Sequence, residues 1–237
     1  MSLQYILFDL DGTLLPMDQN IFIKAYFSRL AAKLAPRGID GKALVDAVWG
    51  GTKAMVANDG SRANEEVFWD HFVTVFGEEI RKDQAVFDEF YHTDFQQVQS
   101  ACGFDPRAGE TVAELKARGF TLALATNPIF PAIATESRMH WAGLSKEDFV
   151  LCTTYENSRH CKPNPDYYRD ILRFLGAAPE QCLMVGNDAT EDMIAQELGM
   201  KVFLLTDCLI NAHDRDLSGY PQGSFPELMA YVEQLSR

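Results

Sequence analysis

The chain opens with a short apolar run that stops at acidic residues. Residues 5–8 are all apolar, and residues 9–13 are polar or glycine apart from one leucine. A continuous apolar run of this length, bounded by turn residues, is typical of a buried strand in a parallel sheet. We therefore predict a strand over residues 5–8 that delivers polar side chains into a turn.

The segment from about residue 20 to 99 has helical spacing instead. Phe22, Tyr26 and Leu30 recur every fourth residue, and Phe68 and Phe72 do the same. Such stripes predict helices that bury one face. We predict an all-helical insertion here. The Trp-Gly-Gly-Thr sequence at residues 49–52 is interpreted as a flexible break, which either faces substrate or merely links two helices.

Beyond Gly103, strand-like and helical segments alternate. Glycine follows several of the helical segments, where it is a common stop signal. Alternation of this kind indicates βαβ units and a parallel sheet with helices on both faces. We predict strands over residues 120–126, 149–153, 182–185 and 201–205, and helices over residues 111–118, 131–141, 166–175, 191–198 and 225–235.

Polar side chains follow several of these predicted strands. In doubly wound sheets, ligands bind just beyond the carboxyl ends of the strands. The first such turn contains Asp9 and Asp11, whose side chains project to one side if the chain stays extended. Two carboxylates in different environments can divide the work of nucleophile and proton carrier. A calcium-type loop or a solvated turn is the alternative for this pair taken alone.

Four motifs follow one another along the chain: FDLDGTL at residues 8–14, LATN at 124–127, KPNPD at 162–166 and VGNDATED at 185–192. Together and in this order they resemble the motifs of the haloacid dehalogenase-like (HAD) hydrolases. The resemblance implies a Rossmann-like α/β core of residues 1–17 and 102–237, with a parallel sheet flanked by helices. It also implies an all-helical cap of residues 18–101, inserted after the first strand.

The resemblance implies a role for each matching side chain. Asp9 would be the nucleophile and Asp11 the general acid and base. Thr126, Asn127 and Lys162 would bind the phosphoryl group, with the lysine neutralising its charge. Taken without the motifs, Thr126 is an ordinary turn residue before a proline, and Lys162 is a surface lysine.

The same resemblance implies a Mg²⁺ site of hard oxygen ligands. Asp9 and the backbone carbonyl of Asp11 would contribute, together with the fourth motif. That motif departs from the usual Gly-Asp because the chain has Asn187 and Asp188. We favour Asp188 as the anionic ligand, with Asn187 as a further oxygen donor and Asp192 supporting them from behind. Capping of a helix N-terminus is the competing explanation for both acidic residues.

The function implied is a magnesium-dependent phosphatase that hydrolyses a small phosphomonoester through an aspartyl-phosphate. A dehalogenase is one rival, although those relatives need no acid at the position of Asp11. A β-phosphoglucomutase-like phosphomutase and a non-catalytic protein that binds a phosphorylated ligand are two more. Specificity would reside in the cap, where residues 68, 69, 72 and 76 form an aromatic cluster that we assign to helix core rather than to a substrate platform.

The net charge and the cysteine content indicate which partners and which cellular location to expect. The 237 residues carry 21 Lys plus Arg and 34 Asp plus Glu, a formal net charge of −13. Such an excess repels phosphate backbones and anionic membranes, so we expect neither a nucleic acid polymer nor a membrane as partner. Five scattered cysteines without CxxC spacing fit reduced thiols and a cytoplasmic location. The sequence does not indicate an oligomeric state.

Overall fold

The computed structural model describes residues 2–236, and a parallel sheet forms its core. The strand order is β2-β1-β3-β4-β5, and every neighbouring pair is parallel. The first strand is thus an interior strand, as its wholly apolar sequence predicts. This confirms the predicted α/β fold class. The strands are β1 (Tyr5–Phe8), β2 (Thr121–Leu124), β3 (Cys182–Gly186), β4 (Lys201–Leu205) and β5 (Gln222–Gly223).

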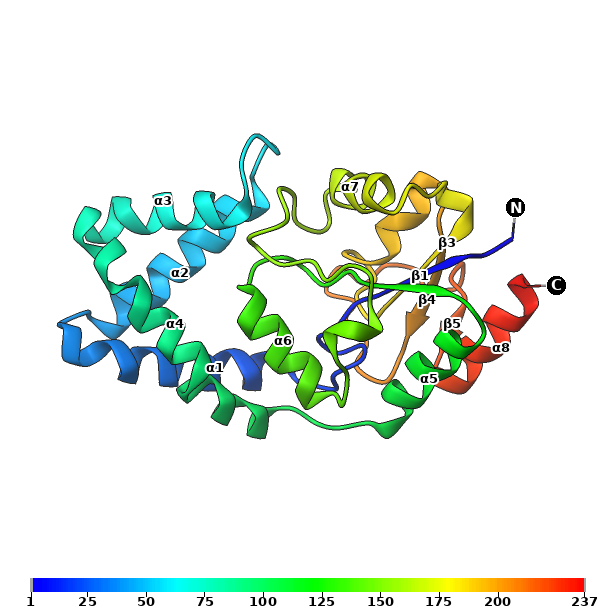
Figure 1. Cartoon of the computed structure of the whole chain (residues 1–237), viewed down its shortest axis with the longest axis horizontal. Coiled ribbons are helices and arrows are strands. Elements are labelled where there is room, and N and C mark those ends of the chain that lie inside the picture. The colour runs from blue at the N-terminus through cyan, green and yellow to red at the C-terminus, as the bar shows by residue number, and fades with distance from the viewer. Residues whose placement is uncertain (1, 237) are drawn as a thin grey trace.

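Helices cover both faces of this sheet (Figure 1). Alternate strand residues face opposite sides, so Ile6 and Phe8 join one buried cluster while Leu7 joins another. The first cluster includes side chains of α5 and α8, and the second includes side chains of α7 and the 3-10 helix η6. The bounds are α5 (Pro106–Ala117), α6 (Ala132–Trp141), α7 (Pro165–Leu175), η6 (Met193–Leu198) and α8 (Phe225–Leu235).

The helices between β1 and α5 form a separate block beside the sheet, at the left of Figure 1. The chain enters and leaves this block side by side, because Met17 and Cys102 form a bridge and Gly103 N–H donates to the Pro16 carbonyl at 2.7 Å. The block contains α1 (Gln19–Leu34), η1 (Ala35–Arg37), α2 (Gly41–Val56), α3 (Asn64–Phe76), η2 (Glu78–Asp83), α4 (Gln84–His92) and η3 (Asp94–Ala101).

Three local predictions were wrong. Residues 149–153 form no regular strand, although three backbone hydrogen bonds and an isolated bridge between Leu124 and Cys152 hold them beside β2. Residues 191–198 form a short 3-10 helix that begins at Met193 instead of an α-helix. Residues 49–52 lie inside α2 rather than at a break. A Cβ on Gly51 would meet the Phe68 ring at 2.6 Å, so this glycine lets α3 pack closely against α2.

The described helices include none that is both long and apolar enough to cross a bilayer.

Candidate active site

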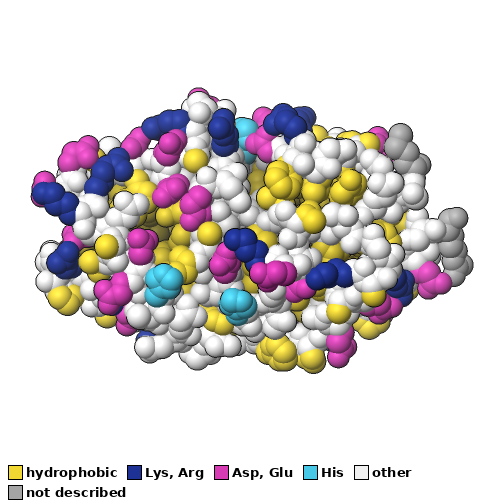
Figure 2. Space-filling view, viewed as in Figure 1, with side chains coloured by type: hydrophobic (Ala, Val, Ile, Leu, Met, Phe, Trp, Pro, Cys, Tyr) yellow, Lys and Arg dark blue, Asp and Glu magenta, His cyan; other side chains and the backbone are white. Residues whose placement is uncertain are grey.

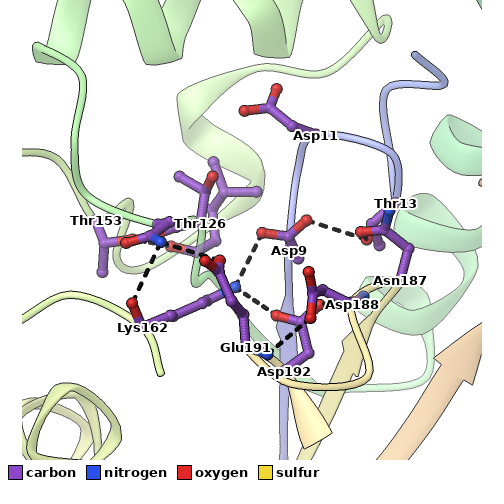
Figure 3. A network of polar contacts seen from close by, with 12 residues as sticks. Asp9, Asp11, Thr13, Thr126, Thr153, Lys162, Asn187, Asp188, Glu191 and Asp192 are labelled. Carbon is purple, nitrogen blue, oxygen red and sulfur yellow. Dashed lines mark hydrogen bonds and ion pairs between the residues drawn. The ribbon is translucent and has the colours of Figure 1, made fainter. Parts of the chain in front are cut away.

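A buried ammonium group connects two carboxylates at the carboxyl ends of β1 and β3. Lys162 Nζ donates to Asp9 Oδ1 at 2.9 Å and to Asp192 Oδ1 at 2.6 Å (Figure 3). The side chains of Lys162 and Asp192 are each 1% exposed, and that of Asp9 is 10% exposed. Lys162 is therefore not the surface lysine that its residue type alone suggests.

Local structure brings these three side chains together. The Asp9 N–H donates to the Val185 carbonyl at 2.9 Å, which fixes the end of β1 against β3. Lys162 lies just before α7, which begins at Pro165 and is capped by the Asn164 side chain. Asp192 turns back over the end of β3, where a Cβ on Gly186 would meet its Oδ2 at 2.1 Å. Glycine is required there for the carboxylate to approach.

Electrostatic interactions among Lys162, Asp9 and Asp192 shift the pKa values of Lys162 and Asp192. Burial alone would lower the pKa of Lys162, but the fields of Asp192 and Asp9 raise it well above its usual value. Burial also raises the pKa of Asp192, and the Asp9 charge raises it further against the opposing effect of Lys162. Two carboxylates share one ammonium group, so the cluster favours a cationic lysine and resists a second full negative charge.

Asp11 lies apart from this cluster. Figure 3 shows its carboxylate turned away from Asp9, because the strand ends at Phe8 and the chain turns before Asp11. Asp11 Oδ2 instead accepts from Arg138 Nη1 of α6, whose side chain is 1% exposed and lies 4.4 Å from the centre of the Phe130 ring. Asp11 Oδ1 is buried without a hydrogen-bond partner. Burial raises the pKa of Asp11, although Arg138 acts to lower it.

The glycine turn places the fourth motif against the first. Gly12 has φ +84°, and a Cβ there would meet Asn187 Nδ2 at 2.2 Å. Thr13 Oγ1 lies 3.1 Å from Asp9 Oδ2 and 3.0 Å from Asn187 Oδ1. Asn187 Nδ2 donates to the Cys208 carbonyl at 2.7 Å, which directs Oδ1 toward the Thr13 hydroxyl. The hydroxyl has one proton for two acceptors, so an oxygen lone pair remains available.

Asp188 makes the capping contacts that the sequence offered as the competing explanation. Its Oδ1 accepts from the N–H groups of Thr190 and Glu191 at 2.7 and 2.9 Å, which is the capping role. The Asp188 N–H in turn donates to Asp192 Oδ2 at 2.9 Å, so Asp192 supports the loop from behind. Asp192 makes no side-chain cap for η6.

Side chains with hard oxygen atoms, the donor type that magnesium prefers, line part of a cavity here. No group of three or more His, Cys, Asp or Glu side chains between residues 2 and 236 is arranged for a metal ion. The set that we consider is of another kind, because it combines the carboxylates of Asp9 and Asp188 with the Asn187 amide and the Asp11 backbone carbonyl. Because Thr13 has one hydroxyl proton for both Asp9 Oδ2 and Asn187 Oδ1, these two oxygens keep acceptor capacity, which fits a cation.

The second motif lies on the other side of Asp9. Thr126 is buried, and its carbonyl accepts from Thr153 Oγ1 at 2.7 Å and from the Tyr167 hydroxyl at 2.9 Å. Asn127 Nδ2 donates to Glu191 Oε2 at 2.9 Å, whereas its Oδ1 is buried without a partner. Burial raises the pKa of Glu191 to about 7, against the opposing effect of Lys162.

A cavity of about 330 Å³ opens between these residues and the helical block. Ligand pockets typically range from ~300 to ~1,000 Å³. The lining includes Asp9, Asp11, Thr126, Asn127 and four residues of the fourth motif, together with side chains of the helical block such as those of Trp49 and Trp69. Lys162 reaches the site through Asp9 and is not part of the lining.

Sequence reasoning missed Arg138 and Glu191. A signal for Arg138 was its position one turn after Ala134 on the buried side of the predicted helix over residues 131–141. Glu191 lies within the quoted fourth motif, but nothing in its spacing distinguishes it from a solvated residue. The assignment of Phe68 and Trp69 to helix core was incomplete, because both also line the cavity.

Replacing Lys162 with methionine should destabilise the fold by about 3–5 kcal/mol at pH 7.5, because Asp9 and Asp192 are left buried without a counter-charge. Burial raises the pKa of Asp192 to about 6, so at pH 5 its protonation relieves the repulsion and the loss should be smaller. Urea unfolding at both pH values measures this. Lys201→Met, at an exposed position, is the control. An equal and small loss for both variants would contradict the account.

Glu191→Gln tests the raised pKa. The folded pKa of about 7 exceeds the usual 4.5, so the folded state keeps a proton that the unfolded chain releases between these values. The contribution of Glu191 to stability is therefore fully present below about pH 4.5 and is lost as the pH rises through 7. The variant should match the wild type at pH 5 and exceed it at pH 8 by about 1–3 kcal/mol in unfolding free energy. A stability difference independent of pH would refute this.

Comparisons with known proteins identify the family. The chain is 29% identical over 188 residues to a protein of Oceanobacillus iheyensis named pyrophosphatase PpaX, covering 79% of this chain and 76% of that one. It is 27% identical over 209 residues to a Vibrio cholerae phosphoglycolate phosphatase, covering 86% and 85%. The solved 2-haloacid dehalogenase of Pseudomonas syringae shares the fold, with a TM-score of 0.65, 20% identity and coverage of 98% and 99%. The model of the haloacid dehalogenase-like hydrolases matches residues 3–199, and the chain belongs to this family of hydrolases.

Proposed function

We propose that this hydrolase is a phosphatase that cleaves small phosphomonoesters through an aspartyl-phosphate on Asp9. The observation that carries the proposal is the contact of the Lys162 ammonium group with Asp9 at the floor of the cavity. A fixed positive charge beside a carboxylate nucleophile is suited to a phosphoryl group, whose charge must be neutralised as it is transferred. The phosphatase names of the Oceanobacillus and Vibrio relatives support the same chemistry.

In the first step, a carboxylate oxygen of Asp9 attacks phosphorus and the bond to the leaving oxygen breaks. The leaving oxygen takes a proton from Asp11 and departs as an alcohol. Asp11 suits this role because Arg138 holds one of its oxygens, while the unpartnered oxygen belongs to a side chain that lines the cavity. Burial also raises the pKa of Asp11, which favours the protonated form that this step needs.

In the second step, water attacks the phosphorus of the acyl phosphate. Asp11, now ionised, accepts the proton of that water, and the bond between phosphorus and the Asp9 oxygen breaks. Phosphate leaves and Asp9 is restored as a carboxylate. Throughout, Lys162 offsets charge near Asp9, and Thr126 and Asn127 bind the phosphoryl group from the opposite side. A halide leaving group needs no proton, so the free Asp11 oxygen favours phosphatase over dehalogenase.

We propose a Mg²⁺ ion as cofactor, held by Asp9, the Asp11 backbone carbonyl and Asp188, with Asn187 as a further donor. When bound, magnesium supplies positive charge that stabilises the phosphoryl oxygens. The orientation of Asn187 by Cys208 supports its participation.

We further propose that residues 18–101 form a cap domain on a core of residues 1–17 and 102–237. The adjacent connections at Met17 and Cys102 support a block that moves as one piece. A small phosphorylated metabolite is the expected substrate, and the scattered cysteines support a cytoplasmic location.

Asp9→Asn should abolish phosphatase activity, with a loss of at least about 10³-fold in kcat, because an amide is a poor nucleophile. The unfolding free energy should change far less than for Lys162→Met, since Asp192 still pairs with Lys162. Magnesium-dependent release of phosphate from an aryl phosphate measures the activity. Full turnover by pure Asp9→Asn protein would reject the mechanism.

Asp188→Asn should weaken Mg²⁺ binding by about 10-fold or more. Two readouts apply: the Mg²⁺ concentration that half-saturates activity, and the Mg²⁺-dependent rise in thermal midpoint. Asp166→Asn removes an exposed carboxylate outside the cavity lining and should change neither. If Asp188→Asn retained the wild-type Mg²⁺ dependence in both measurements, Asp188 would not be a ligand.

A further inference from the structure

The part of the cavity formed by the helical block is largely aromatic. Ten aromatic residues are among those lining the whole cavity. Trp69 and Phe87 meet edge to face with ring centroids 5.3 Å apart, and Phe27 and Trp49 are tilted at 5.7 Å. Trp49 is 42% exposed, so this aromatic wall continues to the surface. Figure 2 shows hydrophobic side chains within a hollow over the helical block, with acidic side chains beside it.

The same cavity lacks positive charge for a leaving group. No lysine, arginine or histidine is among its lining residues within the described range 2–236. The two nearby cations are already engaged, Lys162 by two carboxylates and Arg138 by Asp11. Asp88 and Glu191 line the cavity, so carboxylates add negative charge beyond that of Asp9.

A polar pair interrupts the aromatic wall. The indole N–H of Trp69 is buried and has no hydrogen-bond partner. The Tyr155 hydroxyl lies nearby. Burial raises the pKa of Tyr155, and the indole N–H opposes part of that rise. Both residues line the cavity. An indole N–H can only donate, so it suits an acceptor atom on the ligand.

From these features we propose that the substrate is a phosphomonoester whose alcohol carries an uncharged aromatic ring, held against Trp69 and Phe87. This inference rests on the proposed phosphatase function and specifies its leaving group. Ring packing against aromatic side chains adds to the gain from apolar burial. A leaving group with its own carboxylate or phosphate is disfavoured, because it would be desolvated beside Asp88 and Glu191 with no free cation. The chain therefore differs in specificity from what the names phosphoglycolate phosphatase and pyrophosphatase describe in its relatives.

Three phosphate esters with leaving alcohols of similar acidity test the proposal. They are 2-phenylethyl phosphate, n-propyl phosphate and phosphoglycolate, each measured with the wild-type protein and Mg²⁺. We expect kcat/KM for the phenylethyl ester to exceed that for the propyl ester by about 10-fold or more. Phosphoglycolate should be the poorest of the three. No advantage of the ring, or a preference for phosphoglycolate, overturns the inference.

Pairs of matched variants test which side chains cause the preference for the phenylethyl ester. Trp69→Leu should reduce the advantage of phenylethyl over propyl phosphate, whereas Phe76→Leu, on the same helix but outside the cavity lining, should preserve it. Asp88→Lys should raise kcat/KM for phosphoglycolate relative to propyl phosphate by a few-fold. Glu180→Lys makes the same charge change at the amino-terminal side of β3, away from the cavity, and should not. Equal effects of the paired variants overturn the assignment of the cavity.

Binding separates this inference from the function on which it rests. Calorimetric titration of Asp9→Asn protein with Mg²⁺ and each ester should give the order phenylethyl, propyl, phosphoglycolate from tightest to weakest. That order without turnover of any ester by the wild type supports the ring preference and rejects the phosphatase. Turnover with equal affinities, or with phosphoglycolate bound most tightly, supports the phosphatase and rejects the ring preference.

Discussion

One buried ammonium group organises the site. Lys162 has almost no exposed surface, and removing such a charge from water is costly unless counter-charges lie close by. Asp9 and Asp192 supply them from the ends of two adjacent strands. The requirement to pair this charge therefore brings β1, β3 and the segment before α7 into one arrangement, and it fixes the carboxylate that we propose as the nucleophile.

A second buried pair gives Asp11 a different environment. Arg138 approaches from α6 and holds one carboxylate oxygen, so Asp11 is separated from the Lys162 cluster despite being only two residues from Asp9. Two neighbouring carboxylates thus acquire unlike partners, which is what a division between nucleophile and proton carrier requires. The helical block covers Asp9 and Asp11 with an aromatic surface. Interactions between charges are stronger there because little water screens them.

Sequence patterns predicted the features that repeat along the chain. The apolar runs identified β1, β3 and β4, because buried parallel strands need apolar residues on both faces. Residues 149–153 carry a similar run but follow the edge strand β2 with little pairing, which composition cannot reveal. Motif order indicated that Asp9, Lys162 and Asp192 belong to one site. The burial of Arg138 left a signal in the helix pattern, but its pairing with Asp11 was not predictable, because the two residues lie 127 positions apart and only the packing of α6 brings them together.

The account depends most on covalent attack by Asp9. Wild-type protein mixed with 2-phenylethyl phosphate and Mg²⁺, quenched in acid within one turnover and digested, can be analysed by mass spectrometry for the site of phosphorylation. The account predicts an acid-stable, base-labile phosphoryl group on the peptide that contains Asp9, at Asp9 itself. Steady turnover with the phosphoryl group on another residue would contradict it.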